Sequence, residues 1–214
     1  AEARLVEVAR SRNLPAKLNT GAREDQSERL TWLKQHNFSV VRYFYRMTRS
    51  LLESIPEPQL PEGFSIRPLQ GEAEVEDWVE MFNQTFIDHW NFHPMTPEKR
   101  LYWMSEAAYQ PDIDLVAVAP DGNLAAFSYC VINQQENARK GCNEGWVADL
   151  GTRRGYRQQG LGRAMLLNSL QVLKANGMET AILAVDSENP SGALGLYESV
   201  GFRKLYAFVS FAKE

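Results

Sequence analysis

The chain has 214 residues, a net charge of −4 at pH 7 and the apolar and aromatic content of a packed globular protein. This length allows one sizeable core plus an appendage, and an acidic chain without a basic stripe is a poor partner for nucleic acid. An apolar run of about 18 residues and a signal sequence are both missing, so we expect a cytoplasmic protein without a membrane segment.

Cysteine and histidine spacing argues against a metal site. The two cysteines, Cys130 and Cys142, lack metal-ligand spacing and are expected to be free, buried thiols in a reducing compartment. His89 and His93 have a suitable spacing but lack an evident third ligand. We therefore expect no bound metal.

The first fifty residues predict helix, strand, helix, strand. The expected elements are a helix over 1–13, an extended piece at Pro15 to Leu18, a helix capped by Asp25 and running to about Gln35, and a strand over 38–47. A Pro- and Glu-containing stretch, 53–62, then reads as a stiff linker. It separates a partial N-terminal segment, 1–52, from a complete domain, 63–214.

The larger domain predicts alternating strands and helices. In order we expect a strand at 64–68, a helix over 72–90, a helix over 97–109, a hairpin of 113–119 and 124–133, a polar loop over 134–143, a strand at 144–152, a helix to Asn176 with Gly177 as its cap, a strand at 180–186, a helix begun by Asn189-Pro190 and ending before Gly201, and a final strand at 206–211. This order is typical of an α/β sheet with helices on both faces.

The most informative stretch lies between the strand at 144–152 and the following helix. It reads Arg157-Gln158-Gln159-Gly160-Leu161-Gly162, and Leu166, Leu170 and Leu173 follow at helical spacing. Free backbone N–H groups and the positive end of the helix dipole would then face an anion such as a diphosphate. The loop lacks the Lys-Ser/Thr of a P-loop and the third glycine of a dinucleotide fingerprint. A plain tight turn stays the alternative.

The N-terminal segment resembles the end of the chain. The pairs Leu30 with Leu194, Phe38 with Phe202 and Phe44 with Phe208 share one offset, and the element order agrees. The segment therefore reads as the last third of a second copy of the domain, and chance similarity of two α/β segments stays open.

Two motifs together resemble the GNAT superfamily of acetyl-coenzyme A dependent N-acetyltransferases. The first is the loop from Arg157 to Gly162, and the second is Asn189, Tyr197 and Gly201-Phe202 at the right separation. The segment 86–90 and Val185-Asp186 further resemble the C-terminal domain of tandem, mycothiol synthase-like relatives. The resemblance implies a GNAT fold: a mixed central sheet, splayed between the strands at 144–152 and 180–186, the domain's strands 4 and 5.

The resemblance also implies a site for acetyl-coenzyme A. The pantetheine arm would lie between the splayed strands, the N–H near Leu150 would face the thioester oxygen, and the loop N–H groups would hold the diphosphate. The implied residues are Leu150, Gly151, Thr152, Arg157, Gln158, Gln159, Gly160, Leu161, Gly162, Arg163, Asn189 and Tyr197.

Tyr197 matches the family's acid for the departing thiolate. The family's base aligns with Trp146, so Glu144, two residues earlier on the same strand face, is the candidate base. Asp149 lies on the opposite face and is weaker unless a bulge re-aims it. The acceptor amine would meet Asp88, His89 and Trp90.

These residues imply an acetyltransferase that acts on a primary amine of a small molecule, by direct transfer in a ternary complex. The alternatives are a non-catalytic acyl-coenzyme A sensor or scaffold module, and a half of a larger tandem protein whose pocket needs another portion. A homodimer or a missing N-terminal portion is the expected protein partner.

Overall fold

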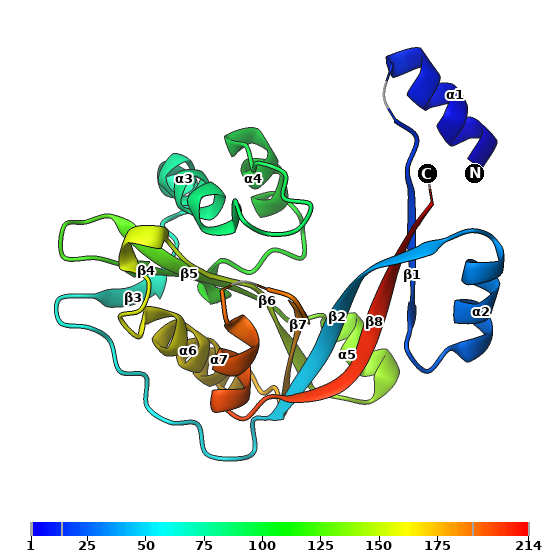
Figure 1. The fold of residues 1–214 in the computed structure, drawn as a ribbon. Coiled ribbons are helices and arrows are strands. Elements are labelled where there is room, and N and C mark those ends of the chain that lie inside the picture. The colour runs from blue at the N-terminus through cyan, green and yellow to red at the C-terminus, as the bar shows by residue number, and fades with distance from the viewer. Residues whose placement is uncertain (1, 14, 190, 214) are drawn as a thin grey trace. The chain divides into compact units, whose positions relative to one another are not determined.

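The computed structural model describes residues 2–13, 15–189 and 191–213 of a mixed α/β protein with an open sheet (Figure 1). Its contacts divide it into two compact units. The larger unit comprises Thr48–Leu183 and Gly195–Phe202, and the smaller one comprises Ala1–Met47, Ala184–Leu194 and Arg203–Glu214. Among the helices in the described ranges, none has the length and apolarity needed to span a bilayer.

The larger unit is built on strands in the order β7-β6-β5-β4-β3. Their bounds are β3 Ser65–Pro68, β4 Asp114–Val118, β5 Leu124–Val131, β6 Glu144–Thr152 and β7 Thr180–Asp186. Neighbours pair antiparallel except β6 and β7, which pair parallel. The predicted strands of this unit are confirmed to within about two residues.

Helices cover both faces of these strands (Figure 1). On one face, α3 (Val75–Phe86) and α4 (Pro97–Met104) lie over a core that contains Trp78, Val116 and Phe127. On the other face, α6 (Leu161–Ala175) packs Leu161 and Met165 against Leu115 and Ala117. Because successive strand residues point to opposite faces, Leu115 and Val116 serve different cores.

Helix α6 ends as its sequence predicts. Gly177 has a positive φ of 80°, and its N–H donates to the Lys174 carbonyl, while the Met178 N–H donates to the Leu173 carbonyl. This pair of bonds is the Schellman arrangement, in which glycine accepts a left-handed conformation at little cost. The turn directs the chain into β7.

The smaller unit has the strand order β1-β8-β2. Its elements are α1 Glu2–Arg12, β1 Leu18–Arg23, α2 Ser27–Gln35, β2 Ser39–Ser50 and β8 Arg203–Lys213. A small core joins Ala22, Leu33, Phe38, Val209 and Phe211. The predicted helix-strand-helix-strand order is confirmed for its first four elements, but the extended piece expected at Pro15 to Leu18 is instead the strand Leu18–Arg23. The origin of the segment as part of a second domain copy stays a prediction.

The structure corrects three helix predictions. The helix expected over 72–90 is a 3-10 turn, Gly71–Glu74, followed by α3, which ends at Phe86, where the His89 N–H closes a turn onto the Phe86 carbonyl. The helix expected to reach Tyr109 ends at Met104, and the Tyr109 hydroxyl instead donates to Asp114 of β4 (2.7 Å). Finally, the last helix, α7 (Ala193–Ser199), begins later than expected. Pro190, predicted in its first turn, lies outside the described residues.

The expected loop over 134–143 contains helix α5, Gln134–Lys140. The Asn133 side chain accepts the Glu136 N–H (2.9 Å), and Gly141 ends the helix at φ +64°. These caps stabilise a short helix without an apolar stripe. Asp25 does not cap α2, because its carboxylate binds Arg23 and Gln26 occupies the N-cap position.

Candidate active site

The loop after β6 presents unpaired backbone donors at the start of α6. Gly160 is the N-cap, with φ +87°, and the first hydrogen bond of this turn runs from the Ala164 N–H to the Gly160 carbonyl (3.0 Å). The N–H groups of Leu161, Gly162 and Arg163 therefore have no carbonyl one turn earlier. A Cβ built on Gly160 meets nothing within 4 Å, so the space before this helix end is open. The geometry fits an anion.

Two arginines stabilise this loop from within the protein. Arg157 donates to the carbonyls of Thr152 (3.0 Å) and Thr85 (2.9 Å), which fixes the loop to β6 and α3. Arg163 donates to the Ser199 hydroxyl of α7 (2.7 Å). Gln158 and Gln159 are exposed beside Gly160. Arg157 thus orders the loop, while the helix end itself carries the open donors.

A β-bulge changes the direction of side chains on β6. Tyr129 of β5 is opposite Asp149, but Cys130 is opposite Val147, so Ala148 is the extra residue. Val131 is opposite Trp146. Since Tyr129 and Val131 share one face of β5, Asp149 shares a face with Trp146. The sequence made Asp149 a candidate base only if a bulge turned it to the face of Trp146, and the structure contains such a bulge.

The two parallel strands separate after a short ladder. Pairing of β6 with β7 runs from Glu144–Thr180 to Trp146–Ile182, while β6 continues to Thr152. The Arg153 N–H donates to the Ala125 carbonyl of β5 (2.9 Å), so the N–H groups of Thr152 and Leu150, of opposite parity, point away from β5. This leaves the Leu150 N–H available as an oxyanion donor.

Asp149 is a partly buried carboxylate without a hydrogen bond or ion pair to any residue that the structure describes. Burial raises its pKa to about 6, the positive charge of Arg100 opposes this rise, and Asp114 adds to it. An acid with such a pKa is ionised at neutral pH and retains affinity for a proton. These are properties of a general base.

Tyr197 of α7 is buried, and its ring packs edge-on against Phe202 at 6.1 Å. Burial and the negative charge of Asp149 raise the pKa of Tyr197 to about 12. The phenol therefore keeps its proton at neutral pH. The charge of Asp149 therefore acts on Tyr197 in the same direction as burial.

The other candidate base, Glu144, lies at the beginning of β6, where β6 and β7 are still paired. Five residues separate it from Asp149, roughly 16 Å along a strand. Its backbone carbonyl accepts a hydrogen bond from Asn137 of α5 (2.9 Å). Glu144 thus lies at the paired start of β6, and Asp149 lies three residues beyond Trp146, the last residue paired with β7.

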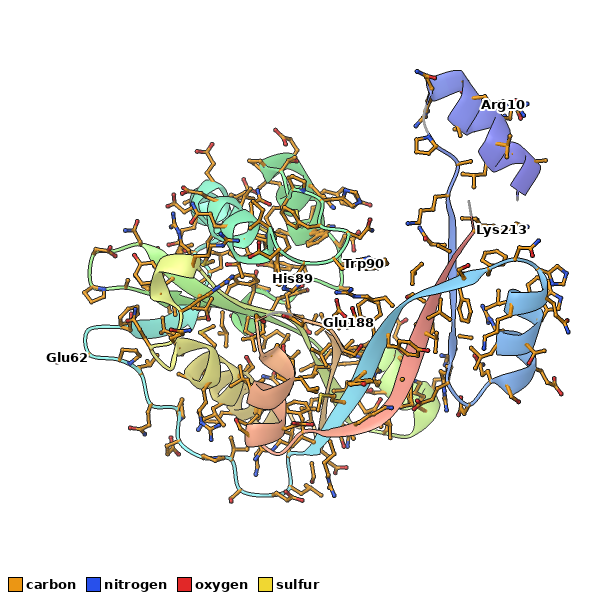
Figure 2. The ribbon with its side chains drawn as sticks, viewed as in Figure 1. Arg10, Glu62, His89, Trp90, Glu188 and Lys213 are labelled. Atoms are coloured by element: carbon orange, nitrogen blue, oxygen red, sulfur yellow. The ribbon has the colours of Figure 1, made fainter. Side chains whose placement is uncertain are left out.

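The residues expected to bind the acceptor lie in the connection between α3 and α4, where Figure 2 labels His89 and Trp90. Asp88 is exposed and forms an ion pair with Arg154 of the loop after β6. The His89 ring packs edge-on against Phe86 at 4.4 Å. Asn189, in the smaller unit, accepts hydrogen bonds from the N–H and hydroxyl of Ser191. The roles predicted for these residues stay predictions.

A buried polar cluster next to the site was not anticipated from the sequence. Arg100 of α4 and Asp114 of β4, both almost inaccessible, form an ion pair, and the Tyr109 hydroxyl also donates to Asp114. The Arg100 guanidinium stacks on the Trp78 ring at 3.8 Å. Nothing in the sequence around Asp114 indicates that this carboxylate pairs with Arg100, which lies 14 residues earlier.

One family model matches the part of the chain that contains these residues. The model described as "Acetyltransferase (GNAT) family" matches residues 75–202. This range contains the loop after β6, Asp149, Tyr197 and the buried cluster. It covers more than half of the chain.

Curated relatives and solved structures agree with this match. A protein named mycothiol acetyltransferase from Thermobispora bispora is 29% identical over 77% of this chain and 55% of its own length. A protein of the same name from Acidothermus cellulolyticus is 30% identical over 78% of this chain and 53% of its own length. The chain thus spans about half the length of these relatives. A crystal structure of a GCN5-related N-acetyltransferase from Sphaerobacter thermophilus covers 97% of this chain and 64% of its own, with a TM-score of 0.79 at 24% identity. A tandem GNAT protein from the clavulanic acid biosynthesis pathway covers 97% and 66%, with a TM-score of 0.73 at 14% identity. Both share the fold.

Proposed function

Since the chain belongs to the acetyltransferase (GNAT) family, we propose that it is an N-acetyltransferase that uses acetyl-coenzyme A and acetylates a primary amine of a small molecule by direct transfer. The observation that carries the proposal is the bulge of β6, which puts Asp149 on the face of Trp146 in the strand that leads into the open end of α6. A module that only binds an acyl-coenzyme A needs neither a base nor a buried acid at this place. The name of the curated relatives supports acetyl as the transferred group.

The residues at the site fit the donor. The open N–H groups of Leu161, Gly162 and Arg163 would bind the diphosphate, and the outward N–H of Leu150 would stabilise negative charge on the thioester oxygen. When bound, acetyl-coenzyme A supplies an activated acetyl group and a thiolate leaving group. The Gly160 conformation and the Arg157 bonds keep the loop open for this contact.

Asp149 and Tyr197 would move the protons. The Asp149 carboxylate accepts one proton from the incoming ammonium group, so that the neutral amine nitrogen attacks the carbonyl carbon. As the C–N bond forms and the C–S bond breaks, the Tyr197 Oη gives its proton to the sulfur and recovers one from the acylated nitrogen. Asp149 then releases its proton to water. The balance is an ammonium and a thioester giving an amide, a thiol and one proton.

A covalent acetyl-cysteine is not favoured by this structure. Cys130 is free and buried, and burial raises its pKa to about 12, so the thiolate needed as a nucleophile is scarce at neutral pH. Cys142, in the segment after α5, is also free, but it is only partly buried and so differs from the buried thiol that the sequence predicted. Direct transfer needs neither thiol.

Calorimetric titration and a Tyr197→Phe variant test the proposal. We expect acetyl-coenzyme A to bind, with dephospho-coenzyme A and NAD as specificity controls. Thiol release in the presence of amines should fall about a hundredfold in the variant, because general acid catalysis contributes at least about that factor, while the affinity for acetyl-coenzyme A stays the same. Failure of acetyl-coenzyme A to bind would refute the function. Unchanged turnover in Tyr197→Phe would refute the role of the acid alone.

A further inference from the structure

A cavity of about 270 Å³ opens on the sheet face that carries Asp149. Helix α4 and the segment after it contribute Arg100, Trp103, Glu106, Ala108 and Tyr109 to its wall, and β5 contributes Tyr129. All these residues belong to the larger unit. The volume is near the lower end of the range for small-molecule sites, so it suits a body of about one ring.

The cavity adjoins the proposed base through one residue. Tyr129 lines it and is the cross-strand partner of Asp149. Residues directly opposite each other on antiparallel strands have Cβ atoms about 5 Å apart and point to the same face. Asp149 therefore lies directly beside a residue that forms the wall of the cavity.

The wall is aromatic. The rings of Tyr109 and Tyr129 stack with centroids 5.9 Å apart, and the Tyr109 hydroxyl is held by Asp114. The ring of Trp103 completes the aromatic part of the lining. Flat, rigid rings of this kind bind the face of another ring with little loss of side-chain entropy.

The polar groups favour a cation. The charge of Arg100 is balanced by Asp114, which leaves Glu106 at the exposed rim and Asp149 beside Tyr129 as carboxylates. Arg100, 1% exposed, has an Nε without a hydrogen-bond partner among the described residues, and so has the Asp114 Oδ1. Both atoms belong to the buried cluster behind the wall of the cavity.

We propose that this cavity is the acceptor pocket and that it selects a primary amine carried on a single ring, aromatic or sugar, with the ring on Tyr109, Tyr129 and Trp103 and the ammonium at Asp149. This inference rests on the proposed acetyltransferase function and replaces Asp88, His89 and Trp90 as the main contacts of the acceptor. Linear amines have no ring to stack on the aromatic side chains of the wall, so they would bind less tightly.

Two neighbouring alanines provide a matched test. Ala107 and Ala108 are both exposed, but only Ala108 lines the cavity. Ala108→Trp adds a large side chain to the wall of the cavity, and Ala107→Trp adds the same side chain next to it in the sequence. Tyramine, glucosamine and the linear amine cadaverine serve as acceptors in a thiol-release assay. Tyramine is also titrated calorimetrically into each protein saturated with coenzyme A, where turnover is impossible.

We expect wild-type protein to acetylate tyramine and glucosamine with at least a tenfold lower KM than cadaverine. Ala108→Trp should raise that KM and the Kd of tyramine at least tenfold, with the Kd of acetyl-coenzyme A unchanged, and Ala107→Trp should match wild type. The pocket proposal would be overturned by any of three results: equally good transfer to cadaverine and the ring amines, transfer to neither ring amine, or equal effects of the two variants. The proposed acetyltransferase function would still stand if acetyl-coenzyme A bound and acetyl transfer occurred. Absence of acetyl-coenzyme A binding would instead refute the function on which the pocket rests.

Discussion

Burial acts on Asp149 and Tyr197 in complementary ways. It raises the pKa of the carboxyl to about 6 and that of the phenol to about 12. At neutral pH the first group has lost its proton and the second has kept it. At this pH the two groups therefore offer one proton acceptor and one proton donor.

The pH dependence of activity should identify the base. We expect kcat/KM to rise about tenfold per pH unit below about pH 6 and then to level off, because the ionised form of Asp149 is required. Asp149→Asn should lose this acid limb and at least about a hundredfold in rate. Measurement of kcat/KM against pH with a fixed amine checks both statements.

Glu144→Gln separates the two candidate bases in the same assay. If Asp149 is the base, the acid limb persists in Glu144→Gln. If the limb persists in Asp149→Asn and vanishes in Glu144→Gln, the assignment to Asp149 is wrong and the base is Glu144. Binding of acetyl-coenzyme A to each variant controls for folding.

At the scale of elements, β6 organises the site. Its bulge at Ala148 puts Asp149 on the face of Trp146, and its end beyond Trp146 is free of the β7 ladder. Glycine at position 151 then allows α3 to approach closely. A Cβ there would lie 2.5 Å from Thr85 Cγ2 and 2.8 Å from Phe127 Cε1.

Gly151→Ala should destabilise the protein by about 1 to 3 kcal/mol, because backbone or neighbouring side chains must shift to relieve the overlap. Gly155→Ala is the matched control, since a Cβ at Gly155 meets nothing within 4 Å. Urea unfolding followed by circular dichroism measures both. Equal midpoints for the two variants would show that α3 does not press on β6 at this position.

At the scale of the whole molecule, the charge of Asp149 lowers the free energy of unfolding at neutral pH. A partly buried carboxylate without a partner among the described residues is less stable ionised than in water. The pKa of Asp149 is about 6 in the folded protein and about 3.9 in an unfolded chain. The folded state therefore binds the proton more tightly, and the stabilising effect of this proton is full below about pH 4 and lost as pH rises through about 6.

Asp149→Asn should therefore be more stable than wild type at pH 7.5. We expect a gain of about 1 to 2 kcal/mol, less than the full shift implies because the carboxylate is partly exposed. The gain should shrink toward zero at pH 4, where wild type is also uncharged at this position. Urea unfolding of both proteins at the two pH values checks this. A variant that is less stable at pH 7.5 would contradict the destabilising role of the charge.

Local sequence pattern determined much of the fold. Strands β6 and β7 have the predicted bounds, and Gly177 ends α6 as expected, because alternation, helical spacing and glycine conformations depend on neighbours in the chain. The same local logic located the helix N-terminus at Gly160. Helix α5 is stabilised by polar caps and lacks an apolar stripe, so the sequence pattern predicts a loop there.

Only the tertiary structure decided what surrounds the reactive groups. The bulge at Ala148 depends on the register between β6 and β5, and so the face of Asp149 is invisible in β6 alone. Likewise, the Arg100–Asp114 ion pair and the cavity beside Tyr129 join residues that lie far apart along the chain. A pKa depends on burial and on charges brought near by folding. The sequence therefore determined the family and the position of the helix N-terminus at Gly160, while the candidate base Asp149 and the cavity beside Tyr129 required the structure.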